Sequence, residues 1–92
     1  CMTWTEDATP DAVAAVAAGL AELPALIPDL RGYRFGSDAG LAAGNADFAV
    51  VADFDDVEGW RRYMDDPSHQ AVLRDRIRPI LASRVAVQPQ LD

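Results

Sequence analysis

The sequence contains a single cysteine, Cys1, and a single histidine, His69, among 92 residues. One cysteine excludes a disulfide within the chain and fits a reducing compartment. A lone histidine with scattered acidic residues and no neighbouring cysteine does not make up the ligand set of a zinc or iron site. We therefore expect no metal.

Lysine is absent as well, so all eight cationic side chains are arginine, and fifteen acidic residues bring the net charge to −7. The arginines do not gather into a basic stripe, which makes nucleic acid and anionic membranes poor partners. No hydrophobic run approaches the roughly 20 residues that cross a bilayer. The residues given show no basic-then-apolar leader, and we expect a cytoplasmic protein.

Half of the residues are hydrophobic and a quarter are charged, which is the balance of a folded globular domain. We expect residues 1–92 to form one domain. A domain of this size buries only roughly 60–65% of its unfolded surface, so association with a second copy would help to stabilise it. The sequence opens on a strand-like stretch, and we expect that the first strand begins upstream of Cys1.

Hydrophobic periodicity predicts the order of helices and strands. Thr9 and Pro10 form a helix start, and Pro24 and Pro28 bracket the end of that helix. A glycine-rich loop separates two strands of alternating pattern. In chain order we predict a strand at residues 1–5, a helix from residue 10 that ends between Pro24 and Pro28, and strands at 30–37 and 47–54. A helical region in two parts follows, at 57–65 and 67–81 (bent or broken near Pro79), and a last strand at 83–90.

This β-α-β-β-α-β order is the ferredoxin-like pattern of the α+β class, an antiparallel sheet with helices on one face. Such a sheet leaves its second face bare. A second copy that covers it with the same face would form an isologous dimer. We predict a homodimer through the open sheet face.

The junction between the two parts of the split helical region carries the candidate chemistry. Asp66 would cap the second part and Pro67 would take its first position, which places His69 in the first turn. Helical spacing puts His69 on an apolar face, and the helix N-terminus disfavours imidazolium. A neutral imidazole and the phenol of Tyr63 could act as base and acid. Alternatively, they bond each other or the backbone and complete a helix corner.

The stretch DFDDVEGWRRYMDDPSH, residues 53–69, resembles the hallmark segment of the stress-responsive A/B barrel (Dabb) family. In that segment a strand ending in phenylalanine and an acid leads to a helix with tyrosine, then to proline and a histidine two residues later. Thr9-Pro10 and Ile27-Pro28-Asp29-Leu30 also fit the family spacing. The resemblance covers essentially the whole chain.

The resemblance implies a dimeric α+β barrel with a small apolar cleft between sheet and helices in each subunit. Some members are polyketide cyclases, in which residues matching His69 and Tyr63 would remove a proton flanked by carbonyls and donate a hydrogen bond to the enolate. That chemistry needs no cofactor. The cleft would hold a hydrophobic or aromatic small molecule, and the lining we predict is Met2, Trp4, Ala17, Leu20, Phe48, Val50 and Val72.

Three functional hypotheses follow. The first is a barrel that binds a hydrophobic or aromatic metabolite, with cyclase-like or isomerase-like chemistry at His69. The second is a non-catalytic stress-response or scaffold protein. The third is a cofactor-independent monooxygenase, which similar barrels also host. An open cleft with convergent polar groups favours the first, and side chains packed onto the imidazole favour the second.

Overall fold

A computed structural model describes residues 1–90, which form four strands and three α-helices. The elements in chain order are β1 (Met2–Trp4), α1 (Pro10–Leu26), β2 (Gly32–Ser37), β3 (Phe48–Asp53), α2 (Val57–Asp65), α3 (Pro67–Val72) and β4 (Leu81–Arg84). A π-helical stretch, Leu73–Ile77, and a 3₁₀ turn, Arg78–Ile80, join α3 to β4.

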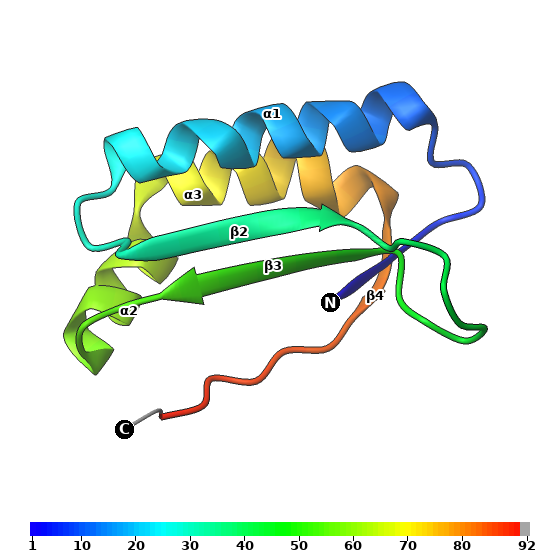
Figure 1. Ribbon diagram of the computed structural model, residues 1–92. Coiled ribbons are helices and arrows are strands. Elements are labelled where there is room, and N and C mark those ends of the chain that lie inside the picture. Colours follow the sequence, from blue (N-terminus) through cyan, green and yellow to red (C-terminus); the bar gives the residue numbers. More distant parts are fainter. Residues whose placement is uncertain (91–92) are drawn as a thin grey trace.

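The four strands form one antiparallel sheet in the order β2-β3-β1-β4. The helices α1 and α3 lie side by side over the same face of the sheet, and no helix covers the other face in residues 1–90 (Figure 1). The predicted ferredoxin-like α+β fold is therefore confirmed.

Side-chain caps start the helices where the sequence predicts them. Thr9 Oγ1 accepts from the Ala12 amide at 3.1 Å. The carboxylates of Asp56 and Asp66 accept from the amides of Gly59 and Ser68, both at 2.8 Å. Each cap satisfies a backbone donor that the first helical turn leaves free.

Helix α1 ends at Leu26, between Pro24 and Pro28 as predicted, because burial of Leu23 and Ile27 holds its last turn against the core. Strand β2 begins at Gly32, two residues later than predicted, and the last helix and last strand differ more. The last helix changes to π-helical geometry from Leu73 on, so its departure from α-helical form begins well before Pro79. Strand β4 begins at Leu81 and ends at Arg84, because it pairs only with the short β1.

The core lies between α1, α3 and the helix-facing side of the sheet. Its buried hydrophobic residues are Val16, Leu20, Leu23, Ile27, Phe48, Tyr63, Val72 and Ile77. Arg76, in the π-helical stretch that follows α3, also contacts α1, since its guanidinium donates to the Ala15 carbonyl at 2.7 Å. No helix within the described part of the chain has the length and apolar character that a bilayer crossing requires.

Candidate functional site

The Asp66 cap and Pro67 place His69 in the first turn of α3, as predicted. The imidazole points inward and is only 5% exposed. Tyr63, from the last part of α2, lies against it, with ring centroids 3.9 Å apart and an interplanar angle of 30°. The structure thus brings the rings of the two candidate catalytic residues into contact in a tilted arrangement.

Burial lowers the pKa of His69, and the nearby backbone carbonyls of Met64 and Tyr63 and the carboxylate of Asp66 offset only part of this effect. The imidazole is therefore neutral at neutral pH, as expected, although desolvation is the main cause and not the helix N-terminus. Its Nδ1 atom is buried and has no hydrogen-bond partner among residues 1–90. A buried nitrogen without a partner is uncommon in folded proteins.

Tyr33 is a further neighbour of Tyr63 in the candidate site, and the sequence did not predict this contact. Its hydroxyl lies 3.1 Å from the hydroxyl of Tyr63 and forms a hydrogen bond with it. Burial raises the pKa of both phenols, so both remain protonated at neutral pH. The alternating pattern of residues along β2 predicts that Tyr33 and Phe35 share one face of the strand. The residues around Tyr33 do not indicate that its hydroxyl reaches Tyr63 on α2.

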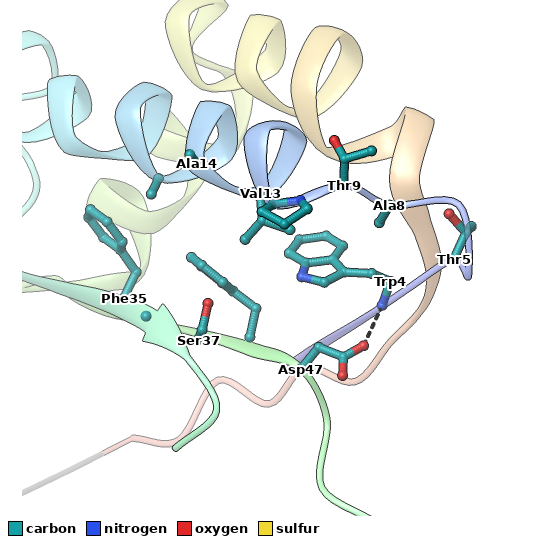
Figure 2. A pocket seen from close by; sticks show the side chains of 13 residues that line it. Trp4, Thr5, Ala8, Thr9, Val13, Ala14, Phe35, Ser37 and Asp47 are labelled. Atoms are coloured by element: carbon teal, nitrogen blue, oxygen red, sulfur yellow. Dashed lines mark hydrogen bonds between the residues drawn. The ribbon is translucent and has the colours of Figure 1, made fainter. Parts of the chain in front are cut away.

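A separate pocket of about 760 Å³ opens at the other end of the sheet, between the first half of α1, β1 and the hairpin ends of β2 and β3 (Figure 2). Alanines on α1 and before it leave this space open, because their side chains end at Cβ. The lining residues are Trp4, Thr5, Ala8, Thr9, Pro10, Val13, Ala14, Ala17, Phe35, Gly36, Ser37, Asp47 and Phe48.

Three aromatic rings form the apolar wall of the pocket. The ring centroids of Trp4 and Phe48 are 5.6 Å apart, and those of Phe35 and Phe48 are 6.4 Å apart with nearly parallel planes. Asp47 stands at the rim, and its Oδ2 accepts a hydrogen bond of 2.8 Å from the Trp4 backbone amide (Figure 2). Hydroxyls of Thr5 and Ser37 also line the space.

The predicted site residues thus fall into separate places. Trp4, Ala17 and Phe48 line the pocket. Leu20 and Val72 are buried in the core, and Met2 and Val50 pack against it. His69 and Tyr63 do not line the pocket. The signal that could have located it is the pair Ala14 and Ala17, which face the aromatic end of the sheet.

Within residues 1–90, no group of three or more His, Cys, Asp or Glu side chains is arranged to hold a metal ion. The charged pairs lie on the surface and belong to the fold. They are Arg31–Asp55, Arg61–Glu58, Arg62–Asp29 and Arg74–Asp75.

A family model described as the Stress responsive A/B Barrel Domain matches residues 1–89. A dimeric ferredoxin-like protein of unknown function from Thermobifida fusca is 54% identical, with a TM-score of 0.91, over 98% of this chain and 84% of that one. None of the curated proteins matches.

Two more distant structures share the fold. A dimeric protein of unknown function with a ferredoxin-like fold from Bacteroides fragilis is 20% identical, with a TM-score of 0.79, over 94% of this chain and 85% of that one. A protein of Arabidopsis thaliana is 15% identical, with a TM-score of 0.75, over 98% of this chain and 93% of that one.

Proposed function

Because the chain belongs to the stress-responsive A/B barrel family, we propose that it is a homodimeric barrel protein that binds a small hydrophobic or aromatic molecule in the pocket beside Trp4. The observation that carries this proposal is the pocket itself. Its volume of about 760 Å³ lies in the range of small-molecule sites. Such sites combine apolar walls with a few polar groups, as this pocket does.

The shape of the lining supports a flat ligand. Trp4 and Phe35 are only partly buried and present ring surface to the space, while Phe48 behind them is 2% exposed. Aromatic side chains pack favourably against a further ring in offset or edge-to-face geometry. A naphthalene-sized molecule that inserts here would cover the exposed parts of Trp4 and Phe35.

A pocket-filling variant tests this proposal. Ala14→Phe adds a ring on the part of α1 that lines the pocket, whereas Ala25→Phe, the matched control, adds a ring at an exposed position in the last turn of α1, outside the pocket. The neutral probe 2-naphthalenemethanol should shift the indole N–H signal of Trp4 in NMR spectra of the parent and of Ala25→Phe, but not in Ala14→Phe. The indole of Trp60, on α2, provides the internal reference. Equal shifts in all three proteins would contradict the proposal.

A second candidate function is acid–base catalysis at His69 and Tyr63, and the buried, unpartnered Nδ1 of a neutral imidazole favours it. In this reaction His69 removes an acidic proton flanked by two carbonyls, and Tyr63 donates a hydrogen bond to the developing enolate. The phenol ring lies against the imidazole, so a substrate can reach the imidazole only if Tyr63 moves aside.

Hydrogen–deuterium exchange of a 1,3-diketone tests this chemistry without knowledge of the natural substrate. If the candidate is correct, the parent accelerates exchange at the carbon between the carbonyls, and His69→Gln loses that acceleration. General base catalysis contributes typically about 100-fold to 10,000-fold. Exchange at the same rate in parent and variant would leave His69 a structural residue, in agreement with the scaffold hypothesis.

The homodimer would form through the open face of the sheet. Pairs on that face include Arg34 opposite Val51 and Gly36 opposite Ala49, which are small or apolar except for the arginine. Val51 is 46% exposed in the single chain. A second copy that covers this face would remove apolar surface from water, and the Thermobifida fusca relative is described as dimeric.

A further inference from the structure

We infer that the pocket beside Trp4 selects an organic cation, a protonated amine carried on a flat aromatic ring. This inference rests on the proposed ligand-binding function and names the class of ligand. The carboxylate of Asp47 and the aromatic wall carry it together.

The backbone and side chain of Asp47 are fixed by three hydrogen bonds. Its amide donates to the Met2 carbonyl at 2.9 Å, its carbonyl accepts from the Asp38 amide at 2.8 Å, and Oδ2 accepts from the Trp4 amide at 2.8 Å. The Trp4 contact uses one lone pair of an ionised group that can accept about four hydrogen bonds. The carboxylate is therefore held at the pocket rim with acceptor capacity to spare.

No cationic side chain lines the pocket, and Asp47 takes part in none of the ion pairs found in the described part of the chain. Two further acids, Glu6 and Asp7, are exposed and stand in the sequence between the lining residues Thr5 and Ala8. Asp47 is thus the charged residue of the lining, and a negative charge at the rim attracts cations and repels carboxylates and phosphates.

The positive end of α1 is the one local feature that would favour an anion, and it is already compensated. Thr9 Oγ1 occupies the amide of Ala12, and Asp11 places a negative charge in the first turn. The start of α1 therefore does not reverse the preference of the pocket rim for a cation.

The aromatic wall matches a cation as well as a flat ring. Trp4 and Phe35 line the pocket and are only partly buried, and an ammonium group over an aromatic face is stabilised by the ring quadrupole. A ligand with its ring against Trp4 and Phe35 can direct an attached ammonium group toward Asp47. Neutral and anionic analogues lose this contact.

Two isosteric probes test the inference by isothermal titration calorimetry, namely 2-(aminomethyl)naphthalene, a cation at neutral pH, and the neutral 2-naphthalenemethanol. We expect the amine to bind roughly threefold to tenfold more tightly at low ionic strength. Salt should reduce the difference because it screens charge at an open rim. Asp47→Asn keeps an acceptor for the Trp4 amide and should abolish the preference, while Asp65→Asn, an equal charge change at an exposed site on α2, should retain it.

The outcomes separate this inference from the proposed function. If the alcohol and the amine bind the parent equally, or if Asp47→Asn keeps the preference, the pocket binds rings but does not select cations, and the inference is overturned. If neither probe binds, the ligand-binding function fails and the inference fails with it.

Discussion

Burial, more than any charged neighbour, controls the protonation of His69. The residue is 5% exposed, and the ring centroid of Tyr63 lies 3.9 Å from that of the imidazole. The charge of Asp66 favours imidazolium, but the effect of burial is larger, and the pKa of His69 is lowered. The neutral imidazole expected from the sequence is thus found in the folded chain, with burial as its main cause.

The free energy of unfolding should consequently depend on pH through His69. Because the pKa in the folded state lies below the unfolded value of about 6.5, the unfolded chain binds more protons at mildly acidic pH. The stability contribution is fully present above about pH 6.5 and is lost as the pH falls, by at most about 1.4 kcal/mol per pH unit.

Urea unfolding between about pH 5 and pH 7.5, where most carboxylates stay ionised, measures this dependence. His69→Gln keeps a polar side chain of similar reach but cannot take up the proton, so its stability should change less across the window. A parent protein with as flat a profile as the variant would show that His69 has no lowered pKa.

The hydroxyl pair of Tyr33 and Tyr63 should contribute a measurable coupling energy. Removing one hydroxyl leaves the remaining hydroxyl without its partner at a site that is largely closed to water. Each single variant, Tyr33→Phe and Tyr63→Phe, should therefore be destabilised. In the double variant both groups are gone. A double-mutant cycle in urea should give a coupling of about 0.5–1.5 kcal/mol, and strict additivity would refute the bond.

Helices α1 and α3 approach each other closely at Gly19, a position that local propensity marks only as a weakness in the helix. A Cβ atom there would lie 3.0 Å from Arg76 Cδ and 3.2 Å from Val72 Cγ2. Arg76 runs along α1 at this point and bonds the Ala15 carbonyl. A side chain at this position would therefore have to displace the side chain of Arg76 or Val72.

Gly19→Val should destabilise the fold by about 1–3 kcal/mol, the usual cost of inserting volume into a packed contact. Ala18→Val, on the exposed side of the same helix, is the matched control and should cost only about 0.5 kcal/mol through helix propensity. Chemical denaturation of both variants measures the difference. Equal losses would mean that α1 and α3 can separate at Gly19 without cost.

The molecule as a whole presents two different faces. Helices α1 and α3 cover one face of the sheet, whereas the opposite face carries no helix in residues 1–90 (Figure 1). Val51 lies in the middle of β3, with its side chain on that open face opposite Arg34. Association through this face would bring Val51 of one copy against the sheet of the other.

Val51→Arg should therefore convert the predicted dimer to a monomer. The new guanidinium would lie beside Arg34, the cross-strand partner of Val51, so the interface would have to bury two like charges. The dissociation constant should rise at least about 100-fold. Leu26→Arg, at an exposed apolar position on α1, places the same charge on the helical side and should leave the dimer intact. Sedimentation velocity at micromolar concentration distinguishes the two. A Val51→Arg protein that remains dimeric would exclude the open face as the interface.

Much of the fold could be predicted because its signals are local. Thr9, Asp56 and Asp66 each bond an amide two or three residues ahead, so a helix start is visible within one turn of sequence. The alternation in β3 separates its buried from its exposed side chains in the same way. The larger errors fall at the end of α3 and at β4, whose limits depend on what packs or pairs beside them.

The candidate site could be predicted only in part, and the reason is sequence distance. The contact of His69 with Tyr63 follows from one short turn at Asp66 and Pro67, whereas the Tyr33 hydroxyl reaches Tyr63 from a strand 30 residues away. Similarly, the family resemblance implied an apolar cleft, but the position of the pocket depends on how the α1 residues Ala14 and Ala17 face Trp4 and Phe48 across it. Helix starts, strand faces and the family-like segment are determined by residues that are close in the sequence. The open space, the buried Nδ1 and the close contact at Gly19 arise only when distant segments pack, because each is a relation between elements and not a property of one.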